Sequence, residues 1–212
     1  MVNVKICGVT NLSDVRMCVE AGADFIGNIV NIPSSPRSIS PEKSHNILSN
    51  LPDAKKSVAV LIENELESIK KIVNIIDPDF IQLHGSESPQ FVKKVIESVP
   101  AGVVKTIHVS GEESVEEALL FSGFCDAILL DTYSKDHGGS GQQHDWKISK
   151  EIVNQVKCDV FLAGGLNPEN VARAKSIVNP YCLDVSSGVE KKPGIKDPLK
   201  VKSFIENSKS AV

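Results

Sequence analysis

The stretch that decides the fold is "VNVKICGVTNLSDV" at residues 2–15. It opens with a β-branched run that ends at Cys7, turns at Gly8, and enters a helical pattern within a few residues. A strand followed at once by a helix is the building unit of α/β proteins. The fold class therefore depends on how often this unit recurs along the chain.

Seven further β-branched runs alternate with helical patterns after this first unit. The eight predicted strands span residues 2–7, 25–30, 57–62, 80–84, 103–109, 127–132, 160–163 and 182–186. Helix starts are marked by a capping side chain before a proline, as at Ser88-Pro89. Eight strand–helix units in 212 residues predict a single-domain α/β fold, a (β/α)8 barrel over residues 1–212, with an open doubly wound sheet as the alternative.

Composition narrows the partners and the compartment. The formal net charge of −4 predicts no general attraction to nucleic acid, and no apolar run reaches the roughly 20 residues that span a bilayer. We therefore expect no nucleic-acid or membrane partner. The five cysteines form an odd set without a CxxC pair, which favours reduced thiols in a cytoplasmic protein.

Polar side chains recur near the carboxyl ends of the predicted strands. They are Lys5, Cys7, Gln82, His84, Lys105, Asp131, Asp184 and Ser186. A barrel interior is mostly apolar, so each of these groups is either a satisfied core residue or part of a site. Because active sites of barrels lie at the carboxyl ends of the strands, the set as a whole favours a site there.

Two glycine-containing turns follow the last two predicted strands. "FLAGGLNPENV" places Gly164 and Gly165 between a strand and a helix, and "LDVSSGVE" places Ser186, Ser187 and Gly188 after the final strand. Backbone N–H groups of such turns bind phosphate, although glycine also simply closes tight turns. Together they favour a phosphate site, and the "GGSG" of residues 138–141 favours a lid over it.

Two further groups of residues carry weaker signals. Arg37, in a loop after the second strand, is either a solvated arginine or a bidentate partner for a carboxylate. Asp136, His137, His144 and Asp145 lie in one loop, but their spacing matches no metal-ligand pattern, so no metal is predicted there.

The motifs, taken in order, resemble a known family. "VKICGVTN", "GADFIG", "SPRSIS", "IQLHGSE", "LLDT", "GGSGQQHDW", "LAGGLNPENV" and "DVSSGVEKKPGIKD" look like the signatures of phosphoribosylanthranilate isomerase from tryptophan biosynthesis. The resemblance runs from residue 2 to about residue 197. It implies an Amadori rearrangement of an aldose to a ketose, with no cofactor and no metal.

The resemblance also assigns roles to residues. It implies that Cys7 is the general base, that Asp131 is the general acid and that Arg37 binds the anthranilate carboxylate. Further substrate contacts are predicted for Lys5, Gln82, His84, Gly141 and Asp184. Phosphate contacts are predicted for Gly164, Gly165, Ser186, Ser187 and Gly188.

The implied chemistry sets requirements on the two catalytic groups. Asp131 must be protonated to donate to the ribose ring oxygen, so its pKa should be raised by burial. Cys7 must act as a thiolate, so we expect a lowered pKa, helped by Lys5 or by the following helix. The expected partner is a small phosphosugar carrying an anthranilate group, bound by a monomer or a homodimer.

One segment departs from the family pattern. Asn28 and Asn31 stand in "GNIVNIPSSPRS", where the family usually has aromatic and apolar residues in a pattern like GFVF. If these positions line the aromatic pocket, the substrate is shifted. The alternatives are therefore a related phosphosugar isomerase with another substrate, or a non-catalytic barrel that binds a phosphorylated ligand.

Overall fold

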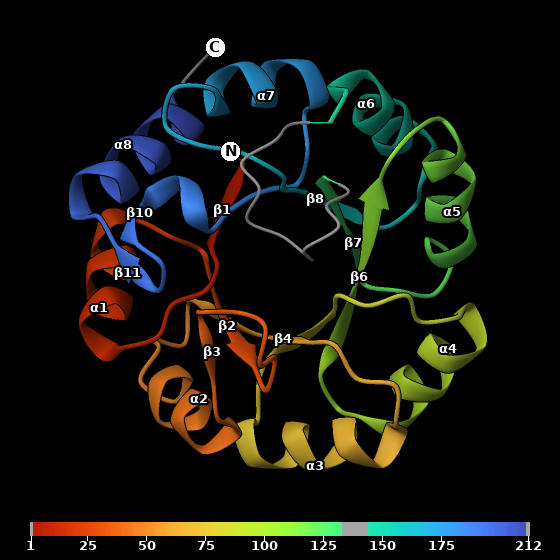
Figure 1. The fold of residues 1–212 in the computed structure, drawn as a ribbon. Coiled ribbons are helices and arrows are strands. Elements are labelled where there is room, and N and C mark those ends of the chain that lie inside the picture. Colours follow the sequence, from red (N-terminus) through yellow and green to blue (C-terminus); the bar gives the residue numbers. More distant parts are fainter. Residues whose placement is uncertain (1, 133–143, 211–212) are drawn as a thin grey trace.

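In the computed structural model, which describes residues 2–132 and 144–210, eight parallel strands close into a barrel inside a ring of helices (Figure 1). The barrel strands are β1 (Asn3–Ile6), β2 (Phe25–Val30), β4 (Lys56–Leu61), β5 (Phe80–Leu83), β6 (Gly102–Val109), β7 (Ala127–Thr132), β8 (Asp159–Leu162) and β9 (Cys182–Val185). Strand β1 pairs with both β2 and β9, which closes the ring. The predicted (β/α)8 barrel is confirmed, and each predicted strand end lies within one residue of the observed end.

Four helix starts are predicted by a capping side chain before a proline; those at Ser40, Ser88 and Asp197 are observed, and the fourth, at Asn167, is not. The helices lie outside the barrel. They are α1 (Leu12–Ala21), α2 (Pro41–Leu48), α3 (Leu66–Ile76), α4 (Pro89–Ser98), α5 (Glu113–Phe121), α6 (Trp146–Gln155), α7 (Val171–Val178) and α8 (Pro198–Lys209). The side chains of Ser40, Ser88 and Asp197 accept hydrogen bonds from first-turn N–H groups. The exception is α7, because Asn167 closes a turn onto the N–H groups of residues 169 and 170 before the helix begins.

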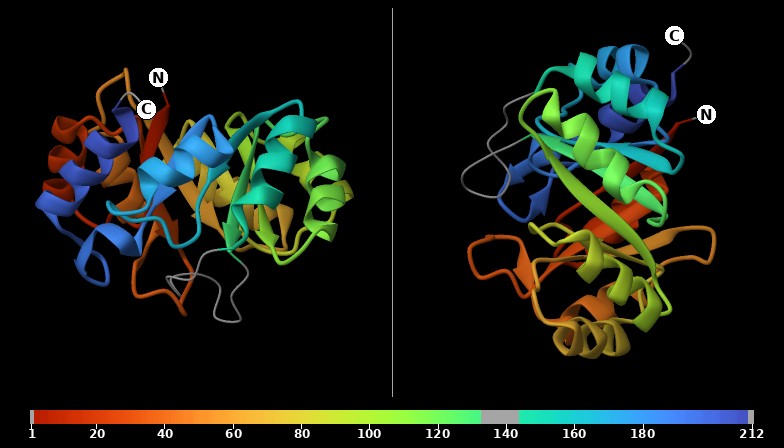
Figure 2. Two further views of the ribbon diagram at one scale, coloured as in Figure 1. Left: turned by 90° about the horizontal axis from the view of Figure 1, so that it is seen from above. Right: turned by 90° about the vertical axis from the view of Figure 1, so that its right-hand side faces the viewer.

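Smaller elements are added at one end of the barrel. Strand β3 (Ser38–Ile39) pairs with the end of β2, while η1 (Ser187–Val189) and the hairpin of β10 (Glu190–Lys192) and β11 (Ile195–Lys196) follow β9. Figure 2 shows that the loop between β2 and β3 and this hairpin project on the same side of the ring. That side is the carboxyl end of the strands, where barrel enzymes carry their active sites.

Alternation along the strands separates two apolar layers. One parity of side chains packs outward against the helices, and the other fills the barrel interior. Near the amino ends the interior is closed by aromatic rings, with Phe25 and Phe161 5.2 Å apart between centroids. The apolar interior ends at Cys7, so the upper part of the barrel is left to polar side chains.

Parity excludes one of the predicted site residues. Lys105 faces outward from β6, where its ammonium group bonds to the carbonyl oxygens of Gly85 and Thr106 and lies 2.9 Å from Glu87. Its ammonium group also lies over the ring of Phe121, on α5. The expectation that Lys105 joins the polar groups inside the barrel is therefore wrong. It is a buried cation whose partners lie under the helix layer.

The described segments also bear on membrane insertion. No helix within residues 2–132 and 144–210 has the length and apolar character needed to cross a bilayer.

Candidate active site

Lys5 and Cys7 point into the barrel from β1 and its carboxyl end. The fully buried Lys5 ammonium donates to Gln82 Oε1 at 2.9 Å and to Asp184 Oδ2 at 3.1 Å, and its positive charge also acts on the thiol of Cys7. Burial acts to lower the pKa of Lys5, but Asp184 and Cys7 together outweigh it, so the pKa is raised. Lys5 is therefore a permanent cation beside the thiol.

The pKa of Cys7 differs from the sequence-based expectation. Burial raises the pKa of the Cys7 thiol above its ordinary value, and the positive charges of Lys5 and Lys196 offset this only in part. The expectation of a lowered pKa is therefore wrong. The fixed charges around Cys7 reduce the cost of forming a thiolate in an apolar barrel, but they do not make the thiolate the resting form.

Asp131 ends the inward-facing row of β7. Burial raises the pKa of its carboxyl group from 3.8 to about 6, although the N–H of Thr132 donates to Oδ1 at 2.8 Å and Lys5 acts in the opposite direction to burial. The predicted raised pKa is confirmed. Such a carboxyl group holds a proton near neutral pH far more often than an exposed aspartate, which suits a general acid.

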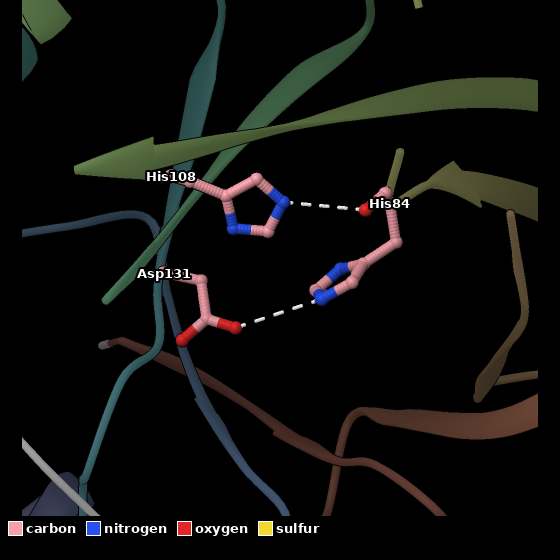
Figure 3. A group of neighbouring side chains, drawn as sticks. All are labelled: His84, His108 and Asp131. Atoms are coloured by element: carbon pink, nitrogen blue, oxygen red, sulfur yellow. Dashed lines mark hydrogen bonds and ion pairs between the residues drawn. The ribbon is translucent and has the colours of Figure 1, made fainter. Parts of the chain in front are cut away.

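Two histidines surround Asp131 (Figure 3). His84 Nε2 lies 3.6 Å from Asp131 Oδ2, and His108 Nε2 lies 3.2 Å from the carbonyl oxygen of His84. The two imidazole rings meet edge to face, with centroids 5.2 Å apart. One ligand-type atom from each of His84, His108 and Asp131 lies within 4.8 Å of the others, so the geometry alone would also allow a metal ion.

His108 was not among the sequence-predicted residues. It lies on β6 directly beside Asp131 of β7 in the strand register, and its parity differs from that of Lys105. Lys105, the polar residue expected at the site from this strand, faces the helices, whereas His108, three residues further on, faces the site. Strand pairing between β6 and β7 is the signal that could have identified His108.

Arg37 makes a bidentate contact with a carboxylate of its own chain. Its Nε and Nη2 donate to Glu190 Oε1 and Oε2 at 2.9 and 2.7 Å, and Lys196 donates to the same Oε1 at 3.0 Å. Burial acts to raise the pKa of Glu190, but Arg37 and Lys196 outweigh it and hold the pKa below its usual range. Two cations share one anion, so the cluster keeps one net positive charge for a ligand.

The two glycine-containing turns meet, as a phosphate site requires. Gly164 and Gly165 both have positive φ, and a side chain on Gly188 would collide with the carbonyl of Leu166 in the neighbouring turn. The hydroxyl oxygen of Ser186 is buried and finds no hydrogen-bond partner among the described residues. An orphaned buried hydroxyl beside two such turns is a free donor for an anion.

Part of the predicted site lies outside the described residues. This applies to Gly141, to Asp136 and His137, and to the whole of the proposed lid at residues 138–141. His144 is described, and its two ring nitrogens lie 3.0 Å from Thr132 Oγ1 and 2.6 Å from Ser149 Oγ. These contacts tie the ring to the fold, and burial lowers its pKa to about 4.

Asn28 lies away from the barrel interior. Its side chain is buried on the outer face of β2, donates to the carbonyl of Val9 at 2.7 Å, and accepts from Ser44 of α2 at 3.0 Å. Asn31 is exposed at the end of β2, with a φ of 52°. Asn28 therefore gives no support to a shifted substrate, because it holds α2 to the barrel instead of lining the pocket.

Fold and site together define a class: a (β/α)8-barrel enzyme with titratable groups at the carboxyl ends of its strands. The family model for N-(5'-phosphoribosyl)anthranilate isomerase matches residues 4–207. The isomerase of that name from Methanocella arvoryzae is 44% identical over 207 residues, covering 97% of each chain. The chain belongs to the N-(5'-phosphoribosyl)anthranilate isomerase family, as its motifs predict.

Solved structures agree with this assignment. The chain resembles monomers generated from the dimeric phosphoribosylanthranilate isomerase of Thermotoga maritima, with a TM-score of 0.87, 40% identity and 99% of each chain covered. It also resembles a phosphoribosyl anthranilate isomerase in complex with reduced 1-(o-carboxyphenylamino)-1-deoxyribulose 5-phosphate. There the TM-score is 0.86, again with 40% identity and 99% coverage of both chains.

Proposed function

We propose that this isomerase converts N-(5'-phosphoribosyl)anthranilate into 1-(2-carboxyphenylamino)-1-deoxyribulose 5-phosphate, with Asp131 as the general acid and Cys7 as the general base. The observation that carries the role of Asp131 is its partly buried carboxyl group, whose pKa is raised to about 6. The role of Cys7 is supported by the Lys5 ammonium, whose positive charge acts to lower the pKa of Cys7 and also acts on Asp131. Base and acid thus share one cation.

The first chemical step opens the ribose ring. Asp131 transfers its proton to the ring oxygen, the bond from C1' to that oxygen breaks, and the lone pair of the anthranilate nitrogen forms the C1'=N bond. Asp131 is left as a carboxylate, and the substrate becomes an iminium ion. The nitrogen of the substrate is the electron sink, so the chain needs to supply only proton transfers.

The second step moves a proton from carbon. The Cys7 thiolate takes the proton from C2', and the C–H electron pair forms a C1'=C2' bond while the iminium nitrogen is neutralised. The resulting enolamine then gains a proton at C1' and loses the proton of its C2' hydroxyl group, which leaves the ketone. The positive iminium ion beside Cys7 favours the thiolate in this step, in the same sense as Lys5.

Arg37 is proposed to bind the anthranilate carboxylate through its remaining edge. Glu190 occupies Nε and Nη2, which leaves Nη1 and the outward N–H of Nη2 for the substrate. Gly8 supports this geometry, since a side chain there would meet Arg37 Cδ at 2.7 Å and Ser186 Oγ at 2.9 Å. Arg37 and Ser186, at the start of the proposed phosphate-binding turn, can therefore lie close together only because residue 8 is glycine.

Phosphate is proposed to bind where the turns after β8 and β9 meet. Ser186 would donate its hydroxyl, and the backbone N–H groups of Gly164, Gly165, Ser187 and Gly188 would complete the shell. Lys196, whose ammonium bonds to the Ser186 carbonyl at 3.1 Å, adds positive charge nearby.

The proposal extends to assembly and compartment. We propose a monomer or a homodimer, and the Thermotoga maritima relative is described as dimeric. Light scattering after size exclusion decides between the two states. A cytoplasmic location is proposed from the five cysteines, all free, which suit a reducing compartment.

The test is isomerisation of freshly prepared phosphoribosylanthranilate, followed by loss of anthranilate-type fluorescence with chelator present. Cys7→Ser and Asp131→Asn should each lower kcat by about 10²-fold or more, the usual contribution of a positioned acid or base. Matched controls are Cys125→Ser, a buried thiol outside the site, and Asp159→Asn, at the amino end of β8. Full turnover by either site variant would refute its assigned role.

The same assay tests Arg37. Replacing it with alanine should raise KM far more than it lowers kcat, because the carboxylate it is proposed to hold does not take part in bond breaking. An effect confined to kcat would contradict the assignment.

A further inference from the structure

A chain of donors and acceptors crosses the barrel from Lys5 to Asp131. Its first link orients an amide. The Lys5 ammonium has only hydrogens to offer, so the Gln82 atom 2.9 Å from it must be the oxygen, which accepts. The Gln82 nitrogen then faces the opposite way, toward β6, and it is a donor only. The orientation of Gln82 therefore follows from its buried cationic neighbour.

The second link selects a tautomer. Gln82 Nε2 lies 3.0 Å from His84 Nδ1. A proton on Nδ1 would point one N–H group at another, so Nδ1 must accept, and the proton of a neutral His84 must sit on Nε2. Thr106 Oγ1 also lies 3.0 Å from Nδ1, and its hydroxyl can either donate or accept, so Thr106 does not select the tautomer.

The third link reaches the acid. His84 Nε2 faces Asp131 Oδ2 at 3.6 Å, which is longer than a hydrogen bond but within the range that tightens when a substrate binds (Figure 3). Asp131 Oδ1 already accepts from the N–H of Thr132 at 2.8 Å. Each carboxylate oxygen thus faces one N–H donor. His108 holds the His84 backbone through its own Nε2, 3.2 Å from the carbonyl oxygen.

We propose that the relay Lys5–Gln82–His84 fixes His84 as the neutral Nε2–H tautomer, and that His84 is the positioning residue that stabilises the carboxylate of Asp131 once the proton has been given to substrate. This inference rests on the proposed acid role of Asp131. The relay also gives Lys5 a second task, because the cation that acts on the Cys7 thiol also determines which nitrogen of His84 carries the proton.

The tautomer of His84 bears on whether His84, His108 and Asp131 form a metal site or a proton-transfer site. A metal ion bound by His84, His108 and Asp131 would need a lone pair on the His84 nitrogen that faces Asp131. That would move the proton to Nδ1, directly against the Gln82 amide nitrogen. The arrangement therefore favours a proton-transfer site over a metal site.

The tautomer can be read directly in the whole protein by 15N NMR with histidine labelling, and His84→Gln identifies the His84 resonances. The wild type should show a protonated, pyrrole-like Nε2 and an unprotonated, pyridine-like Nδ1. A pyridine-like Nε2 in the wild type would overturn the assignment, and the tautomer itself is read in the wild-type protein, with the variant used only to assign the resonances.

A pair of variants tests the cause of the tautomer. Gln82→Met keeps the volume and removes the donor, so both tautomers should become populated and kcat should fall by about tenfold, with KM within about twofold. The matched control is Thr106→Val, which removes the other group beside Nδ1 and should leave the Nε2–H signature unchanged. The reverse result, with Thr106→Val shifting the tautomer and Gln82→Met leaving it intact, would refute the relay.

The outcome is separable from that of the proposed function. If Asp131→Asn retains full turnover, the acid role itself fails, whatever the His84 resonances show. If Asp131→Asn is inactive while Gln82→Met keeps both the wild-type kcat and the wild-type tautomer, the relay alone fails.

Discussion

Activity should be constant from about pH 6 up to the alkaline pKa of Cys7, even though the two catalytic groups ionise in the order opposite to the one that catalysis uses. The reaction needs a protonated Asp131 and an ionised Cys7. Burial places the pKa of Asp131 at about 6 and raises the pKa of Cys7 above its ordinary value of 9.0. The single proton shared by the pair therefore rests mainly on sulfur.

The magnitude follows from the difference between the two pKa values. The productive form and the dominant form hold the same number of protons, so their ratio does not change with pH. With pKa values at least about three units apart, roughly one molecule in a thousand or fewer holds the proton on Asp131 with Cys7 ionised. The rate should fall below about pH 6, where a second proton binds the Asp131 carboxylate, and above the pKa of Cys7, where the last proton is lost.

The assay is kcat/KM for the isomerisation from pH 5 to pH 10, corrected for hydrolysis of the labile substrate. The acid limb should belong to Asp131 and the alkaline limb to Cys7, so Cys7→Ser should remove the alkaline limb from whatever activity remains. A rate that falls steadily as pH rises from 6 to 8 would refute the reasoning. It would mean that Cys7 is already ionised there and that Asp131 is the group losing its proton.

Three further predictions concern stability and the pocket. The pKa of Asp131 in the folded protein is about 6 against an ordinary 3.8, so the fold loses stability as pH rises from about 4 to 6. Asp131→Asn should therefore raise the free energy of unfolding at pH 7, measured by urea titration, by about 2–3 kcal/mol. The pKa of His144 in the folded protein is about 4 against an ordinary 6.5, so up to about 3 kcal/mol of stability is lost as pH falls from about 6.5 to 4. His144→Gln should reduce this pH dependence, and an unchanged dependence of the melting temperature on pH would contradict the prediction. Asn28→Leu should cost about 1–3 kcal/mol of stability, because the Val9 carbonyl and the Ser44 hydroxyl lose their partner, and should leave KM unaltered; a tenfold rise in KM in the folded variant would return Asn28 to the pocket.

The barrel could be predicted from sequence because its signals are local. Each strand is a short β-branched run, and three of the eight helices in the described residues start with a capping side chain before a proline, at Ser40, Ser88 and Asp197. The one displaced start, at α7, has the same local chemistry as the others. Asn167 bonds to backbone N–H groups there too, but it closes a turn, and a side chain that can do either does not fix the helix boundary by itself.

The site was harder to predict because alternation shows which residues of a strand share a face, but not which of the two faces points into the barrel. On β1 the apolar residues Val4 and Ile6 mark one face as outward, so Lys5 and Cys7 could be placed together inside the barrel. On β6 apolar residues occur on both faces, so the sequence alone does not show whether Lys105 or His108 points into the barrel. The pairing of β6 with β7 places His108 beside Asp131, and this pairing is a feature of the tertiary structure that the sequence of β6 does not contain.

The pKa of Cys7 was mispredicted for a related reason. A lysine two residues away on the same strand face correctly predicts a neighbouring charge, but it does not predict how deeply the pair is buried. In this barrel Lys5 has no exposed surface, and its charge is shared among Asp184, Gln82 and the sulfur of Cys7. A cation divided among three acceptors lowers the cost of a thiolate without reversing the effect of burial.

The sharing of the Lys5 charge also explains why a charged group with a large desolvation cost is kept inside the barrel. A buried ammonium ion contributes little net stability when paired with a single carboxylate. Here each of its interactions serves a different part of the reaction. Its charge acts on Cys7, the proposed base, its hydrogen bond to Gln82 leads through His84 to the proposed acid, and Asp184 supplies the compensating charge. Because apolar side chains, aromatic and aliphatic, fill the rest of the interior, these interactions are confined to the polar end of the barrel, and one lysine can act on both proton-transfer groups at once.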